Sequence, residues 1–175
     1  IDCKKHYVPG DVEYLCPTCA IKQKEMEPLR GLLKCIYDYE KVLKVFNPKS
    51  VKGKGERGPA RYLELLPIES PTSIPPLITD LTPLRLAQKI GHDLGLDEVW
   101  IKDDTCLPTG SFKDRASSMV VAIAKEKEID TIATASTGNA AVALAGMAAS
   151  AEMQSVIFVP ESAPKAKLTQ IAVYG

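Results

Sequence analysis

The feature that most constrains this chain is an alternation of strand-like and helix-like segments from about residue 82 to residue 175. Thr82 followed by Pro83 is typical of a helix start, so we predict a helix over residues 83–96. The later segments predict strands at 98–102, 130–135 and 154–159, and helices at 115–128, 138–151 and 165–175. Such alternation implies parallel strands with right-handed crossovers. We therefore expect an α/β fold with an open, mostly parallel sheet flanked by helices.

The part of the chain before this alternation has a different composition. Residues 1–40 carry four of the five cysteines and few long apolar runs, which indicates a small cysteine-bearing head. Residues 41–81 join a basic, glycine-rich stretch to a proline-rich one, which predicts an extended connector with one helical turn at 60–66. We therefore divide the chain into a head (1–40), a connector (41–81) and a partial α/β domain (82–175).

Charge and hydropathy argue against several classes of protein. The 22 basic residues balance 22 acidic ones, so we expect no nucleic-acid partner and no anionic membrane surface. No apolar run approaches the roughly 20 residues that span a bilayer. No secretory signal is visible, so an odd number of cysteines indicates cytoplasmic thiols or metal ligands rather than disulfides. We expect a cytoplasmic protein, and its oligomeric state, including a homo-oligomer, stays open.

The head contains a candidate zinc site. Cys16 and Cys19 form a C-x-x-C, with Cys3 upstream, and thiolates spaced in this way can reach one tetrahedral ion. His6 would complete a site of three cysteines and one histidine. Alternatively, a cysteine directly before Ile1 would complete two C-x-x-C pairs. A zinc-free segment with free thiols is an equally good interpretation, and Cys35 fits neither pattern.

Two loops have the position of a ligand site, because ligands of α/β sheets bind where strands lead into helix N-termini. One contains Lys113, which is partly shielded by Phe112 and could form a Schiff base with a carbonyl group. The other contains Ser136, Thr137 and Asn139 at a helix start, where hydroxyl and N–H groups suit a carboxylate or phosphate. From residue chemistry alone, a surface lysine and ordinary helix capping remain open alternatives.

Longer motifs in this region resemble a known family. "PTGSFKDR" (108–115), followed by "ASTGNAA" (135–141) and preceded by "TPL" (82–84), is similar to threonine synthases. More broadly, the chain resembles the fold type II pyridoxal-phosphate enzymes related to tryptophan synthase β chains. "RYLELLP" (61–67), "FVPESAPKAKLTQIAVYG" (158–175) and the cysteine-bearing head, which is similar to a ribbon ahead of some threonine synthases, extend the resemblance to nearly the whole chain.

The resemblance implies roles for the residues of both loops. Lys113 would hold pyridoxal 5'-phosphate as a Schiff base and then move protons on the substrate, with Phe112 packed near the ring. Asn139 would hydrogen-bond the 3-oxygen of the cofactor, and Ser136 and Thr137 would bind the α-carboxylate of the substrate. The implied reaction is a lyase reaction of amino-acid biosynthesis, which converts O-phosphohomoserine and water to threonine and phosphate.

The resemblance also leaves alternatives. The family's glycine-rich loop for the cofactor phosphate lies beyond Gly175, so we expect a fragment, incomplete on its C-terminal side, that has no turnover by itself. Threonine dehydratase and cysteate synthase are related enzymes that the motifs do not exclude. A non-catalytic zinc-ribbon binding module is the alternative from another class of protein.

Overall fold

The computed structural model describes residues 3–53, 58–78 and 81–175. Its contacts divide the chain into two units, Ile1–Lys44 and Val45–Gly175. The predicted boundaries after residues 40 and 81 stay predictions, and residues 1–2, 54–57 and 79–80 of the predicted head and connector lie outside the described residues.

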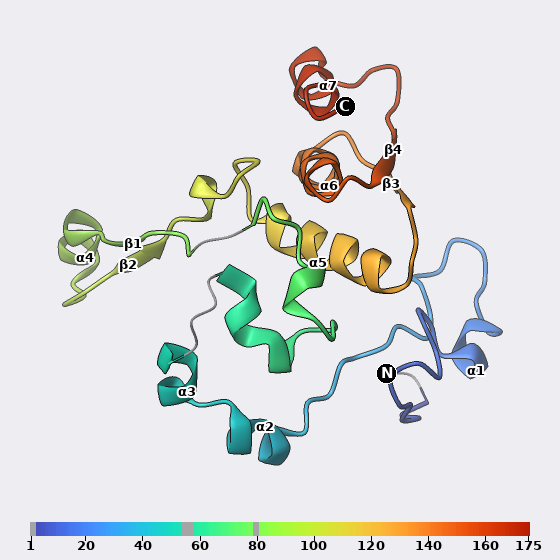
Figure 1. Cartoon of the computed structure of the whole chain (residues 1–175), viewed down its shortest axis with the longest axis horizontal. Helices are drawn as coiled ribbons and strands as arrows, with labels where there is room; N and C mark the ends of the chain where they lie inside the picture. The colour runs from blue at the N-terminus through green and yellow to red at the C-terminus, as the bar shows by residue number, and fades with distance from the viewer. Residues whose placement is uncertain (1–2, 54–57, 79–80) are drawn as a thin grey trace. The chain divides into compact units, whose positions relative to one another are not determined.

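The first unit has little regular structure (Figure 1). Its helix α1 (Pro17–Ala20) begins at a proline directly after Cys16, where a missing N–H costs no hydrogen bond. A bridge between Leu15 and Leu32 brings two segments together beside the cysteines, and the N–H of Cys16 donates to the carbonyl of Gly31 at 2.8 Å. Helix α2 (Tyr39–Val45) ends this unit and enters the second.

The predicted connector is not extended in its described part. It contains the end of α2, helix α3 (Pro48–Gly53) and the 3₁₀ helices η1 (Gly58–Leu65) and η2 (Pro71–Ser73). Proline stands at the start of both α3 and η2, where its fixed φ suits a first helical residue. The prolines therefore start short helices here. The expected turn at 60–66 lies largely within η1.

The prediction of a helix over 83–96 was wrong in its first turn. Residues Leu84–Leu86 form strand β1, which pairs antiparallel with β2 (Trp100–Lys102), and helix α4 covers only Gln88–Leu94 between them. Gly95, with φ +66°, ends α4 in the left-handed region. The predicted strand at 98–102 is thus present, but in the described residues it pairs with β1 and not with the later strands. The 3₁₀ helix η3 (Asp104–Cys106) follows β2.

The second half of the chain has the predicted α/β alternation. Helix α5 (Lys113–Glu126), strand β3 (Thr131–Ala135), helix α6 (Asn139–Ser150), strand β4 (Gln154–Phe158) and helix α7 (Lys165–Ala172) follow in order. Strands β3 and β4 are parallel, with Thr131 opposite Gln154 and Ala135 opposite Phe158. The α/β prediction is confirmed, and it is clearest in this β3–α6–β4 crossover.

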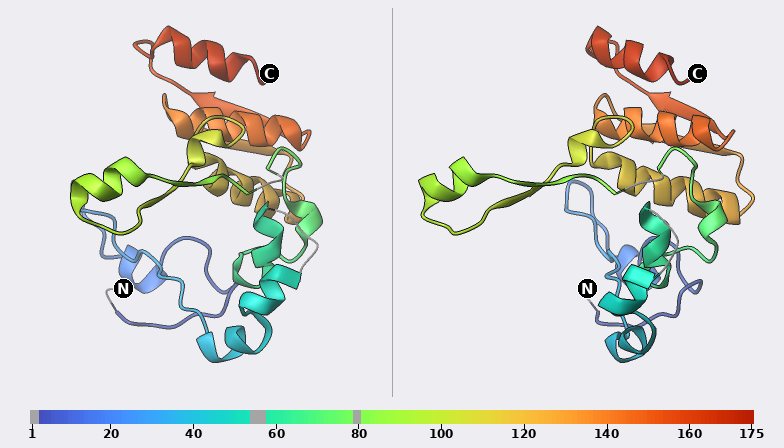
Figure 2. Two further views of the ribbon diagram at one scale, coloured as in Figure 1. Left: turned by 90° about the vertical axis from the view of Figure 1, so that its left-hand side faces the viewer. Right: turned by 60° about the vertical axis from the view of Figure 1, so that its left-hand side comes forward.

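Helix α6 is the centre of this half, because it contacts α5, α7, β3 and β4 (Figure 2). Its residues 141–148 are all buried, and most are alanine, valine or glycine, so neighbouring backbones can approach closely. A core cluster joins it to α5 and the preceding loops through Ile78, Leu107, Val121, Leu144, Met147 and Ala148. Among the described residues, no helix combines the length and apolar character needed to cross a membrane.

Candidate active site

Lys113 is the first residue of α5 and is half-buried. Its Nζ lies 4.7 Å from the centroid of the Phe112 ring, which is itself 61% exposed. Among the described residues, no ion pair or side-chain hydrogen bond is present at this amine. A cation at a helix N-terminus is unfavourable by several tenths of a kcal/mol, so helix stability does not explain a lysine at this position.

The loop that precedes Lys113 is held in place by Asp114, the residue that follows the lysine. Asp114 is fully buried, and its carboxylate accepts hydrogen bonds from the N–H of Thr109, at 2.8 Å, and from the Thr109 hydroxyl. Gly110, which lies between Thr109 and Asp114 in the sequence, has φ +81°, a conformation that residues with a Cβ rarely adopt. The side chain after the lysine therefore closes the loop onto the start of α5 and fixes the Lys113 backbone.

Arg115 connects the same helix to the segment before β1. Its guanidinium donates to both carboxylate oxygens of Asp104, at 2.7 and 2.8 Å, and the Thr82 hydroxyl donates to Asp104 at 2.8 Å. The hydrogen bonds from Arg115 are the main cause that lowers the pKa of Asp104 to about 2. Asp114 and Arg115 thus do not pair with each other. Each contacts a neighbouring element, which is a structural role.

The second predicted loop connects β3 to α6. The N–H of Gly138 donates to the Ser136 hydroxyl at 3.2 Å, and no side chain caps the start of α6. The first N–H groups of such a helix lack carbonyl partners within it and favour an anion. The expected capping by Ser136 or Thr137 is therefore not observed, although the Ser136 hydroxyl accepts a hydrogen bond within the loop.

Asn139, the first residue of α6, has a partner that the sequence did not indicate. Lys167 of α7 donates from its Nζ to the Asn139 Oδ1 at 2.8 Å and to Gln170 at 3.1 Å. Because the amide oxygen is occupied in this way, the Nδ2 group of Asn139 is the one available to donate to a ligand.

The two loops are attached to helices α5 and α6, which pack against each other. Thr109 of the first loop lies directly over Gly146 of α6, where an added Cβ would be 2.8 Å from the Thr109 Cγ2. In the residues that the structure describes, however, no hydrogen bond or ion pair joins Lys113 or Phe112 to Ser136, Thr137 or Asn139.

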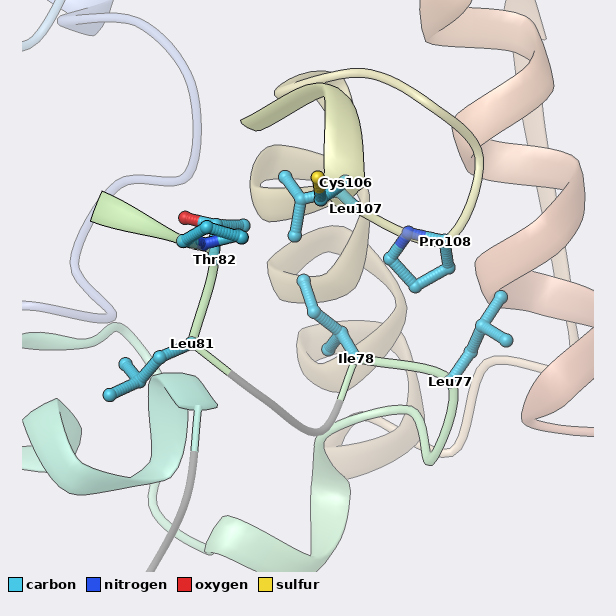
Figure 3. Close-up of a pocket in the computed structure, with 8 residues that line it drawn as sticks. Leu77, Ile78, Leu81, Thr82, Cys106, Leu107 and Pro108 are labelled. Atoms are coloured by element: carbon cyan, nitrogen blue, oxygen red, sulfur yellow. The ribbon is translucent and has the colours of Figure 1, made fainter. Parts of the chain in front are cut away.

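A separate pocket lies beside the first loop (Figure 3). It is lined mainly by apolar side chains from the segment before β1 and from residues 106–108, at and after the end of η3, and it contains none of the predicted site residues. Its lining consists of Leu77, Ile78, Leu81, Thr82, Pro83, Cys106, Leu107 and Pro108.

The three cysteines predicted as metal ligands are brought together. The Sγ atoms of Cys3, Cys16 and Cys19 all lie within 4.8 Å of one another. His6 is outside this group, as is Cys35. In the described part of the chain, the geometry thus selects the three cysteines and does not support His6 as their fourth partner.

Comparison with known proteins identifies the family. Residues 77–175 match the family described as pyridoxal-phosphate dependent enzyme. The chain belongs to this family. The match covers both predicted loops, and pyridoxal phosphate is the cofactor that defines the family's chemistry.

Individual relatives match this chain over different shares of its length. A threonine synthase of Methanocaldococcus jannaschii is 34% identical over 100% of this chain and 40% of its own length. A cysteine synthase B of Escherichia coli is 37% identical but covers only 54% of this chain and 32% of its own length. A serine racemase structure from Dictyostelium discoideum, 32% identical, covers 54% of this chain and 31% of that one with a TM-score of 0.51. The chain therefore spans well under half of these relatives.

Proposed function

We propose that this chain is part of a threonine synthase that converts O-phosphohomoserine and water to threonine and phosphate with pyridoxal 5'-phosphate. The observation that carries this proposal is the extent of the similarity. The threonine synthase of Methanocaldococcus jannaschii matches the whole chain, including the cysteine-bearing head, whereas the cysteine synthase B matches about half of it.

The residues of both loops suit the cofactor. The Lys113 amine has no anionic partner among the described residues, so it is available to hold pyridoxal phosphate covalently, with Phe112 beside the ring. Asn139 would donate from Nδ2 to the 3-oxygen of the cofactor, because Lys167 occupies its Oδ1. Ser136, Thr137 and the uncapped N–H groups of α6 would bind the substrate α-carboxylate.

Bound in this way, pyridoxal phosphate would withdraw electrons from the substrate α-carbon. The protein would then supply position and proton transfer. Lys113 Nζ would accept the α-proton and return a proton later, while Asp114 and Thr109 keep the backbone beside it fixed. The free thiols of the described residues agree with a cytoplasmic location, which we propose together with a small-molecule substrate.

Labelling of Lys113 tests the cofactor site. The longest expressible polypeptide that contains this chain is incubated with pyridoxal phosphate, reduced with borohydride and mapped by peptide mass. We expect a single adduct on Lys113 that is lost in Lys113→Ala and kept in Lys89→Ala, an exposed lysine of α4. Adducts spread evenly over surface lysines would contradict the cofactor site and favour a non-catalytic binding module.

A comparison of two substrates tests the proposed reaction. Phosphate release is measured with O-phosphohomoserine and, separately, with O-phosphoserine plus sulfite. Release from O-phosphohomoserine with formation of threonine supports the proposal. Turnover of O-phosphoserine alone would instead indicate a related replacement enzyme of the same family.

A further inference from the structure

The first unit lacks an apolar core. Of its described residues 3–44, only Cys16, Cys19 and Gly31 are buried. Large side chains that would normally form a core are exposed, among them Tyr14 at 82%, Ile21 at 85% and Met26. A unit of this size cannot bury enough apolar surface to stay folded by itself, so another interaction must hold it.

The thiols have the separation that one metal ion requires. Zinc binds thiolate sulfur at about 2.3 Å, so tetrahedral ligands lie about 3.8 Å apart. The Sγ atoms of Cys3 and Cys16 are 3.5 Å apart, and Cys19 lies within 4.8 Å of both. A disulfide would need a separation of about 2.05 Å, so this arrangement suits a shared ion better than a covalent bond.

The backbone around the thiols is closely fitted. The N–H groups of Cys19 and Ala20 donate to the carbonyl of Cys16 at 3.1 and 2.9 Å, which forms a tight turn between the two buried cysteines. Gly31 passes against this turn with φ +81°, and an added Cβ would lie 3.0 Å from the Cys16 carbonyl and 3.1 Å from the Cys19 Cβ. The second segment can therefore close over the turn only with glycine at this position.

A neighbouring hydroxyl completes the surroundings of one thiol. The Tyr7 hydroxyl lies 3.0 Å from the Cys16 Sγ, within hydrogen-bond distance for a sulfur acceptor. Donors of this kind orient metal ligands and stabilise a coordinating thiolate.

We propose that Cys3, Cys16 and Cys19 bind one zinc ion, and that this ion takes the place of an apolar core in residues 3–44. His6 and Cys35 line the same groove as Cys3 and Cys16 but stand outside the thiol cluster, so they are not ligands. A water molecule takes the fourth position. Binding releases the thiol protons, so metal affinity increases with pH.

Metal content and cobalt substitution test the site. Protein purified under reducing conditions is expected to contain one zinc per chain, and exchange with Co²⁺ should produce the visible absorption of a tetrahedral cobalt–thiolate centre. Cys3→Ser, Cys16→Ser and Cys19→Ser should each lose this absorption, whereas Cys35→Ser, Cys106→Ser and His6→Ala should keep it. Absence of the absorption in the unaltered protein, or its loss in Cys35→Ser or His6→Ala, would overturn the proposed ligand set.

Chelation tests the structural role without any substitution. Removal of the metal should expose residues 3–44 to a protease while leaving cleavage in Val45–Gly175 unchanged, and added Zn²⁺ should restore protection. Unchanged protection after complete metal removal would contradict the role of the ion as a core. Because this readout does not involve pyridoxal phosphate, labelling of Lys113 can succeed or fail independently of it.

Two glycine variants provide a matched comparison. Gly31→Ala and Gly10→Ala both place a side chain at a positive φ, but the space around Gly10 is open. We expect Gly31→Ala to weaken Co²⁺ binding at least tenfold and Gly10→Ala to change it less than threefold. Equal effects would show that the close approach to the cysteine turn is unimportant.

Discussion

The carboxylate of Asp114 accepts two hydrogen bonds from Thr109, one from its N–H and one from its hydroxyl, in a fully buried position. These bonds close the loop that precedes α5, so Lys113 is held between a fixed residue on its C-terminal side and the Phe112 ring on the other. The position of the candidate cofactor lysine thus depends on a neighbour that does not take part in the chemistry.

Removal of the Asp114 carboxylate should destabilise the folded protein. In Asp114→Ala the buried Thr109 N–H loses its acceptor, so we expect the free energy of unfolding to fall by about 3 kcal/mol. Denaturant unfolding measures the change, and Asp97→Ala, an exposed carboxylate of the same chain, should change it by less than about 0.5 kcal/mol. Similar losses in both variants would show that the Thr109 contact contributes little.

Gly146→Ala tests how α6 supports the same loop. Alanine is favoured over glycine in a helix by about 1 kcal/mol, but the new Cβ would lie 2.8 Å from the Thr109 Cγ2. Because overpacking of this kind costs about 1–3 kcal/mol, we expect a net loss of stability.

The double variant Gly146→Ala/Thr109→Ser provides the control. Serine keeps the hydroxyl that contacts Asp114 and removes the obstructing methyl group, so it should recover most of the loss in the unfolding measurement. Strictly additive effects of the two substitutions would contradict a direct clash.

The Asp104–Arg115 pair predicts a dependence of stability on pH. The pKa of Asp104 falls from 3.8 to about 2 in the folded protein, because the ionised carboxylate accepts hydrogen bonds from Arg115. The pair therefore stabilises the fold fully above about pH 5, and this contribution is lost as the pH falls through 4 towards 2.

Asp104→Asn measures this contribution. Because both side chains are partly exposed, we expect the variant to be less stable by about 1 kcal/mol at pH 7. The difference from the unaltered protein should shrink progressively below pH 4 in unfolding curves. A difference that stays constant down to pH 2 would mean that the ionised carboxylate is not its source.

Lys167→Met tests the orientation of Asn139 in the proposed cofactor site. Loss of the 2.8 Å hydrogen bond frees the amide to rotate, so we expect pyridoxal phosphate to bind about fivefold more weakly, equivalent to about 1 kcal/mol. Absorbance titration measures the affinity. Lys165→Met, on the same helix but exposed, is the control and should bind normally. Equal weakening in both variants would indicate a general charge effect.

Much of the architecture could be predicted from the sequence. The helices and strands from residue 113 onwards were expected nearly at their observed limits, because their apolar patterns are strong, and Gly138 and Pro160 mark two of the connections between them. The closeness of Cys16 and Cys19 could also be predicted, because a C-x-x-C turn places two thiols on one side of the backbone, and Cys3 was expected to join them.

Other features depended on the tertiary structure. The Leu84–Leu86 segment has a helical pattern, yet it forms a strand because its partner Trp100–Lys102 lies alongside it after the α4 turn. The hydrogen bond from Lys167 to Asn139 joins residues far apart in sequence. The local sequence around either residue does not indicate that the other is its partner.

The sequence by itself determined the alternation of helices and strands, the two loops at helix starts and the cysteine turn, since each depends on neighbouring residues and on local propensity. Only the tertiary structure decided which strands pair, that Lys167 contacts Asn139, and that His6 stays outside the thiol cluster. These outcomes depend on contacts between segments that come together only when the chain packs. The local sequence pattern of each segment does not predict which other segment it will contact.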